Sequence, residues 1–143
     1  MAVLISACLL GICCRYDCKA KKNQMACKLA QKEILIPVCP EQLGGRPTPR
    51  KPVEILNGRV TESDGTDHTD EFIRGAVETL KIAQINNIKT AVLKSNSPSC
   101  GFGKIYDGTF SKTLTDGNGI TAELLSKNGV KILNEYEIEA LLY

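Results

Sequence analysis

The chain has 143 residues, 43% of them hydrophobic and 24% charged, which is ordinary for one folded soluble domain with a real core. Its 18 basic and 16 acidic residues leave a net charge of +2 and are scattered along the chain. Without a concentrated basic patch or an apolar segment of membrane-spanning length, neither nucleic acid nor a membrane is an expected partner.

Short apolar runs alternate with helical patterns. Four runs are continuously apolar, as expected of parallel strands that are covered on both faces. These runs are residues 3–5, 34–38, 90–93 and 130–133. Four segments are predicted to be helical, namely residues 19–31, 69–86, 120–128 and 135–142. The clearest is 69–86, in which apolar residues recur at spacings of three and four.

Two further segments predict β-hairpins, because each contains a dipeptide typical of a tight turn. Residues 53–61 contain Asn57-Gly58, and residues 104–111 contain Asp107-Gly108. Strands that alternate with helices indicate an α/β fold. We expect one three-layer Rossmann-like domain over residues 1–143, with a mostly parallel sheet and short hairpin insertions.

Seven cysteines are many for a chain of 143 residues. No basic segment precedes the apolar residues 3–10 and no cleavage site follows them, so we expect no secretory signal and a cytoplasmic location. A disulfide framework is not expected in that reducing compartment, and one of seven cysteines must in any case stay unpaired. The cysteines are therefore candidates for metal ligands, nucleophiles or core residues.

Three cysteines each follow a predicted strand: Cys8, Cys39 and Cys100. In open parallel sheets, ligands bind outside the carboxyl ends of the strands, so three such loops could bring three thiolates together. The order of the strands cannot be read from the sequence, however. Three unconnected buried thiols remain the alternative at this point.

The other cysteines carry less signal. Cys13, Cys14 and Cys18 crowd one loop without forming a C-x-x-C pair, and Cys27 is expected in the core of a helix. The single histidine, His68, lies in a polar loop and is expected at the surface. Histidine-based triads and facial iron sites are therefore excluded.

Two glycine-rich segments have structural and functional interpretations. Residues 44–50, with Arg46 and Arg50, could cradle an anion but lack the spacing of a P-loop, which favours a structural turn. Gly101 and Gly103 are expected to permit a close approach of the backbone beside Cys100.

Several motifs in fixed order resemble the thiouracil desulfurase family, over nearly the whole chain. They are Ser-Ala-Cys-Leu-Leu-Gly at 6–11, Cys-Arg-Tyr-Asp at 14–17, Pro-Val-Cys-Pro-Glu at 37–41, Gly-Gly-Arg-Pro-Thr-Pro-Arg at 44–50, Gly-Thr-Asp-His-Thr at 65–69 and Ser-Pro-Ser-Cys-Gly at 97–101. One departure is Cys18, where the family pattern has glycine. The resemblance implies hydrolytic removal of sulfur from 2-thiouracil, giving uracil and sulfide.

The resemblance also implies a 4Fe-4S cluster held by only three cysteines, which by motif are Cys8, Cys39 and Cys100. Three ligands leave one iron open, and a soft iron prefers the sulfur of a thiocarbonyl to oxygen. Attack of water on the adjacent carbon then needs proton transfers.

Glu41, two residues after Cys39, is the best candidate for this acid–base role. Its alternative role is that of a carboxylate at the start of a helix. Ser97 is expected to assist Glu41 in catalysis, and Ser99 and Asp17 are the candidates for contacts with the substrate. No net electron transfer is required.

Other functions remain open. The same fold and cluster would serve another thiolated nucleobase, a nucleoside or a different sulfur compound. A non-catalytic protein with a structural zinc or iron site is a further alternative, and a fourth protein ligand would distinguish it. The expected partner is a small thiolated nucleobase, and the sequence does not indicate the oligomeric state.

Overall fold

The computed structural model describes residues 1–143. Its elements follow in chain order: β1 (Ala2–Ser6), the 3-10 helix η1 (Ala7–Leu10), α1 (Gln24–Leu29), β2 (Ile34–Val38), α2 (Pro40–Leu43), β3 (Glu54–Leu56), β4 (Arg59–Thr61), α3 (Thr69–Ile85), β5 (Thr90–Val92), β6 (Lys104–Tyr106), β7 (Leu114–Asp116), α4 (Ile120–Lys127), β8 (Lys131–Leu133) and α5 (Glu139–Leu142).

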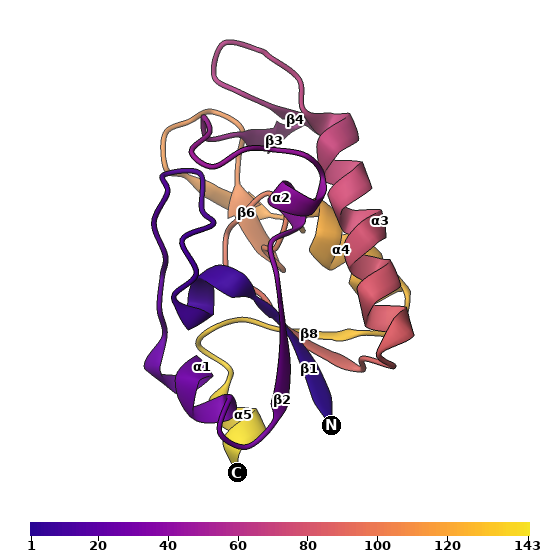
Figure 1. Cartoon of the computed structure of the whole chain (residues 1–143). Helices are drawn as coiled ribbons and strands as arrows, with labels where there is room; N and C mark the ends of the chain where they lie inside the picture. The colour runs from indigo at the N-terminus through magenta and orange to yellow at the C-terminus, as the bar shows by residue number, and fades with distance from the viewer.

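The four predicted strands form one parallel sheet in the order β2-β1-β5-β8. The edge strand β2 is not covered on both faces as predicted, because only its last residue, Val38, is buried. Successive side chains of a strand point to opposite faces, and the two faces are covered by different helices. Val3 and Ile5 pack in a core with residues of α1 and α5, whereas Leu4 packs in a second core with residues of α3 and α4. Figure 1 shows the sheet between these two helical layers. The expected three-layer α/β fold is confirmed.

The helices match the predictions to different degrees. Two of them, α3 and α4, span nearly the predicted residues. By contrast, α1 begins only at Gln24, because the side chain of Asn23 caps the helix by accepting a hydrogen bond from the amide of Ala26. The final helix is also shorter than predicted, since the backbone before it forms three-residue turns, such as the bond from the amide of Glu137 to the carbonyl of Asn134.

One hairpin is confirmed and the other differs from its prediction. Strands β3 and β4 are joined by Asn57-Gly58, both with positive φ. The partner of β6 is β7, so the predicted two-residue turn at Asp107-Gly108 is wrong. Residues 107–113 form a longer loop, because the amide of Asp107 bonds to the carbonyl of Thr113, 2.9 Å away.

Two glycines bring α2 directly against α3. A Cβ added at Gly44 would lie 2.0 Å from the backbone oxygen of Glu71, and one added at Gly75 would lie 2.0 Å from the backbone oxygen of Pro40. Only glycine permits this approach of two backbones. The contact fixes α2, and with it Glu41, at the carboxyl end of the sheet, where both hairpins also lie (Figure 1).

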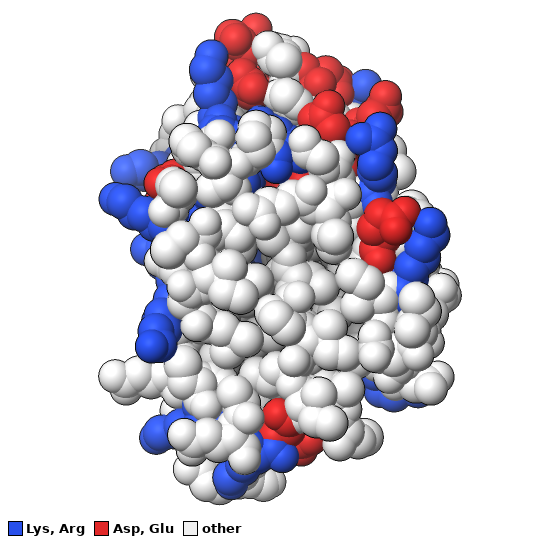
Figure 2. Space-filling model, viewed as in Figure 1, with Lys and Arg blue, Asp and Glu red and all other residues white.

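Charged side chains are unevenly distributed over the surface in the same view. Figure 2 shows acidic and basic side chains gathered around the end of the molecule that carries the β3–β4 hairpin and the start of α3. The face over β2 and α2 carries almost none. No helix of the structure combines the length and the hydropathy needed to cross a membrane.

Candidate active site

A cavity of about 390 Å³ opens at the carboxyl ends of the sheet strands. Its lining comes from segments far apart in the chain, between Ser6 at the end of β1 and Lys112 in the loop before β7. Thiols, hydroxyls, two carboxylates, cations and aromatic rings all contribute to the wall. This is the position at which open parallel sheets bind their ligands.

The structure brings the three predicted cysteines to this cavity. Cys8 lies in η1 directly after β1, Cys39 is the residue before α2, and Cys100 follows β5. Burial raises the pKa of Cys8 to about 11 and that of Cys100 to about 12. Both thiols are therefore protonated at neutral pH, so a metal that bound them would displace their protons.

A fourth thiol, Cys14, also lines the cavity and is only 3% exposed. The Sγ of Cys39 lies 3.6 Å from the backbone oxygen of Cys14. A hydrogen bond between the two thiols lowers the pKa of Cys39 and raises that of Cys14. The spacing of the cysteines does not separate Cys14 from its exposed neighbour Cys13, and only the Cys-Arg-Tyr-Asp motif at 14–17 includes Cys14 without Cys13.

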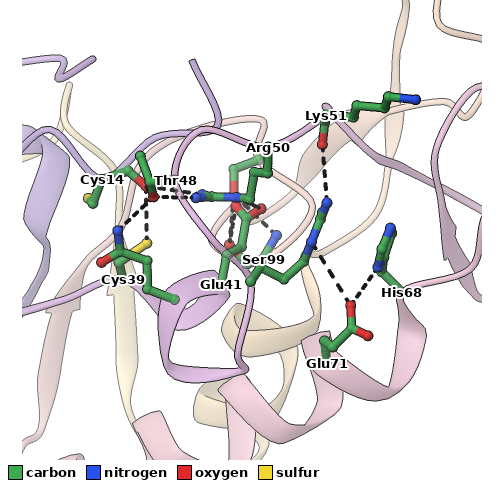
Figure 3. Close-up of polar contacts among 12 residues, drawn as sticks. Cys14, Cys39, Glu41, Thr48, Arg50, Lys51, His68, Glu71 and Ser99 are labelled. Atoms are coloured by element: carbon green, nitrogen blue, oxygen red, sulfur yellow. Dashed lines mark hydrogen bonds and ion pairs between the residues drawn. The ribbon is translucent and has the colours of Figure 1, made fainter. Parts of the chain in front are cut away.

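Glu41, the predicted acid–base group, lies on α2 and faces the cavity between two partners (Figure 3). Its Oε1 accepts a hydrogen bond of 3.2 Å from the Nε of Arg50, and its Oε2 accepts one of 3.4 Å from the hydroxyl of Ser99. The two oxygens are thus in different surroundings. One is held by a cation and the other is bonded to a hydroxyl of the cavity wall.

Ser97 and Ser99 both line the cavity, and their hydroxyls lie 3.1 Å apart. The hydroxyl of Ser97 accepts hydrogen bonds from the backbone amides of Ser99 and Cys100. A Cβ added at Gly101 would lie 2.7 Å from the backbone oxygen of Ser97, which confirms the close approach expected there. Ser97 therefore orients the backbone that carries Cys100.

Asp17, the remaining predicted site residue, does not line the cavity. Its carboxylate accepts a hydrogen bond from the amide of Lys19 and lies 3.6 Å from the guanidinium of Arg15. Arg15 itself does line the cavity. Asp17 thus touches a residue of the wall without reaching the interior.

Two other expectations about polar and thiol residues need correction. His68 is not a free surface residue, because its ring lies between the carboxylates of Glu62 and Glu71 and is half-buried. Cys27 is only partly buried, since α1 places Ala26 and Leu29 in the core instead. Neither His68 nor Cys27 lines the cavity.

Sequence reasoning missed Arg50 as a residue of the site. Its side chain is only 2% exposed. Besides Glu41, its guanidinium donates to the hydroxyl of Thr48 at 2.9 Å and to the backbone oxygen of Cys14 at 3.1 Å. The only available signal was its place in the Gly-Gly-Arg-Pro-Thr-Pro-Arg segment, which also suits a purely structural turn. The aromatic residues Tyr16, Tyr106 and Phe110 were also missed: Tyr16 lies in the Cys-Arg-Tyr-Asp motif, whereas Tyr106 and Phe110 have no local pattern.

The donor set fits an iron–sulfur cluster better than a single ion. No three of the His, Cys, Asp or Glu side chains lie close enough together to hold one metal ion. In a cubane cluster each thiolate binds a different iron, so the ligands surround a larger group. Soft sulfur ligands on separate segments that line one cavity fit that requirement.

Comparisons with known proteins agree with this site. A solved structure of the 4Fe-4S-dependent thiouracil desulfidase TudS has 38% sequence identity and a TM-score of 0.91, and the match covers 99% of this chain and 95% of that one. The uncharacterized protein YbbK of Bacillus subtilis (strain 168) is 39% identical over 98% of this chain and 99% of its own length. The family model for 2-thiouracil desulfurase matches residues 3–137.

These findings confirm the resemblance seen in the motifs, and with it the expected class of enzyme. Each match extends across the sheet, both hairpins and the cavity rather than over one local motif. The chain belongs to the 2-thiouracil desulfurase family.

Proposed function

We propose that the protein removes sulfur from a thiolated pyrimidine such as 2-thiouracil by hydrolysis, with a 4Fe-4S cluster held by Cys8, Cys39 and Cys100. Water supplies the oxygen that replaces the exocyclic sulfur, sulfide leaves, and no net electron transfer is needed. The observation that carries the proposal is the meeting of these three thiols with Glu41 and Ser99 in one cavity. Family membership and the match to a thiouracil desulfidase support it.

When bound, the cluster would supply a Lewis-acidic iron that prefers sulfur to oxygen. The chain's own residues provide the proton transfers. Glu41 receives a proton from water at Oε2, because Arg50 already occupies Oε1. Ser99, bonded to Oε2, orients that oxygen and contacts the substrate, while Ser97 keeps the Ser99 hydroxyl and the Cys100 backbone in place.

The proposal uses no histidine and gives no role to Asp17, which lies outside the cavity lining. The lining residues extend over most of the chain, which supports residues 1–143 acting as one desulfurase-like domain. A cavity of about 390 Å³ lies in the range of small-molecule sites, which supports a small molecule as the substrate. The match to a thiouracil desulfidase supports a thiolated one.

The first test is anaerobic reconstitution with iron and sulfide, followed by an assay of sulfide release from 2-thiouracil. We expect a brown protein with the visible absorption of a 4Fe-4S cluster that bleaches in air, and formation of uracil. A colourless protein that holds stoichiometric zinc would contradict the proposal and favour a structural metal site. Release of sulfide only from another thiolated base or nucleoside would keep the chemistry and change the substrate.

The number of ligands needs its own test, because Cys14 is a fourth thiol in the same cavity. Alanine at Cys8, Cys39 or Cys100 is expected to abolish cluster binding. Cys14→Ala should retain the cluster's absorption and iron content, as should the matched exposed control Cys13→Ala. Loss of the cluster in Cys14→Ala alone would make Cys14 a fourth ligand and remove the open iron from the proposal.

A further inference from the structure

The loop of residues 107–113, between β6 and β7, has only two residues in the cavity wall, Phe110 and Lys112. The same two residues have left-handed backbones, with φ of 57° and 60°. Such a conformation is uncommon for a bulky side chain and costs roughly 1 kcal/mol, so it persists only where the surroundings hold it. The two residues of the loop that line the cavity are therefore the two with strained backbones.

The carboxylate of Glu54, on β3, holds the loop in this shape. One oxygen, Oε1, accepts hydrogen bonds from the amides of Gly108 at 3.0 Å and Phe110 at 3.2 Å. The loop also lies directly on β3, because a Cβ added at Gly108 would be 2.7 Å from the Cβ of Leu56. Inside the loop, Asp107 accepts hydrogen bonds from the amide and hydroxyl of Thr109. These hydrogen bonds hold the loop, and with it Phe110, in a fixed position at the cavity wall.

Phe110 differs from the other aromatic residues of the wall. Tyr16 already has the guanidinium of Arg15 over its ring, at 5.5 Å from the centroid. Tyr16 and Tyr106 also carry hydroxyl groups that require polar partners. Phe110 has no polar atom to satisfy and remains partly exposed at the cavity. A flat heterocycle can stack on such a ring without regard to its exact pattern of hydrogen-bonding groups.

We propose that Phe110 is a substrate-binding residue that stacks on the ring of the thiolated pyrimidine, and that Glu54 is its positioning residue. The inference rests on the proposed function, since it assigns the residue that recognises the ring in the same cavity. It also separates two tasks. The thiols and Glu41 act on the thiocarbonyl group, whereas Phe110 holds the plane of the ring.

The direct test compares Phe110→Leu and Phe110→Tyr with wild type in the reconstituted holoenzyme. Stacking of a base on an aromatic side chain supports roughly a tenfold rise in KM for 2-thiouracil in Phe110→Leu, with kcat and iron content unchanged. Phe110→Tyr should keep a KM near wild type. The matched control is Phe102→Leu, because Phe102 precedes β6 in the chain and does not line the cavity. An unchanged KM in Phe110→Leu overturns the inference.

A binding measurement separates this inference from the proposed function. The chain contains no tryptophan, so Phe110→Trp creates a single fluorophore at the proposed stacking position. Saturable quenching of its emission by 2-thiouracil is expected in the holoenzyme, but not for Phe102→Trp. If wild type released no sulfide while Phe110→Trp was still quenched, the proposed function would fail and the stacking would stand. Identical responses of the two variants would overturn the stacking.

The role of Glu54 is tested by a double variant. Glu54→Ala removes the acceptor for the Gly108 and Phe110 amides and should raise KM severalfold, whereas Glu54→Gln keeps an oxygen acceptor and should restore most of the affinity. If Glu54 acts through Phe110, Glu54→Ala combined with Phe110→Leu should have the KM of Phe110→Leu alone. Additive effects would instead mean that Glu54, which also lines the cavity, contacts the substrate itself.

Discussion

Arg46 and Arg50 lie four residues apart in one loop, both have buried guanidinium groups, and both face glutamates, yet their surroundings differ. Arg50 donates to Glu41, Thr48 and Cys14 at distances of 2.9–3.2 Å. Arg46 lies 3.7 Å from Glu62 and 4.0 Å from Glu71, its Nη2 donates a hydrogen bond of 3.4 Å to the backbone oxygen of Lys51, and its Nη1 has no hydrogen-bond partner. Arg50 is held in the cavity wall by short hydrogen bonds, whereas Arg46 has longer contacts between the β3–β4 hairpin and α3.

The difference shows that burial and pairing alone do not identify a functional cation. The partners of Arg50 are the predicted base and the backbone beside two thiols, so its hydrogen bonds determine the shape of the cavity. The partners of Arg46 are also held by His68 and Lys51, and none of these residues lines the cavity. Substitutions in the two clusters should therefore separate effects on turnover from effects on stability.

The largest contrast is expected between the two glutamates. Glu41→Gln keeps the size of the side chain but removes its basic site, so turnover should fall by roughly two or more powers of ten while the cluster is retained. Glu71→Gln, in the other cluster, should stay near wild-type turnover per cluster. Single-turnover desulfuration under anaerobic conditions measures both. Wild-type turnover in Glu41→Gln would remove Glu41 from the mechanism and direct attention to Ser97 and Ser99.

Arg50→Met should lower kcat by roughly tenfold or more, because Glu41 loses the partner that fixes Oε1. In a Glu41→Gln background, Arg50→Met should lower kcat almost no further, since the two residues act as a unit. Iron content and cluster absorption, measured in parallel, show whether the cavity is intact. Independent, multiplying losses would mean that Arg50 acts on the cavity by another route, such as its bond to Cys14.

Arg46→Met should reduce the free energy of unfolding by about 1–2 kcal/mol and leave kcat per cluster near wild type. The loss is modest for a buried cation because the contacts are long, one nitrogen is unpaired, and Glu62 and Glu71 keep other partners. Denaturant unfolding of the metal-free protein measures it. A kcat as low as that of Arg50→Met would contradict the conclusion that only Arg50 affects turnover.

Lys51→Ala is expected to have the smallest effect. Its ammonium group lies 3.9 Å from Glu62 and its side chain is 74% exposed, so solvent screens the pair. Neither the midpoint of thermal unfolding nor the turnover should change measurably. A clear loss of stability would indicate that the cluster around Arg46 depends on Lys51 more than the distances suggest.

The parts of this molecule that follow local patterns could be predicted from the sequence. The four sheet strands are mostly apolar runs, and α3 has an apolar face at helical spacing, so both carry their own signal. The β6–β7 loop could not be predicted, because a nearby Asp-Gly pair resembles a two-residue turn while a backbone bond from Asp107 to Thr113 closes a longer one. The start of α1 could not be predicted either, because it depends on a single capping hydrogen bond to the side chain of Asn23.

For the active site, the sequence by itself determined which chemical groups follow the strands. A cysteine follows each of three strands, a glutamate lies two residues after one of these cysteines, and two serines precede another. Only the tertiary structure decided that these groups share a cavity, because the order of the strands and the packing of α2 on α3 depend on contacts distant in the chain. The same holds for Cys14, Arg50 and Phe110. Their surroundings come from loops that meet only in the folded chain, so no local periodicity could reveal them.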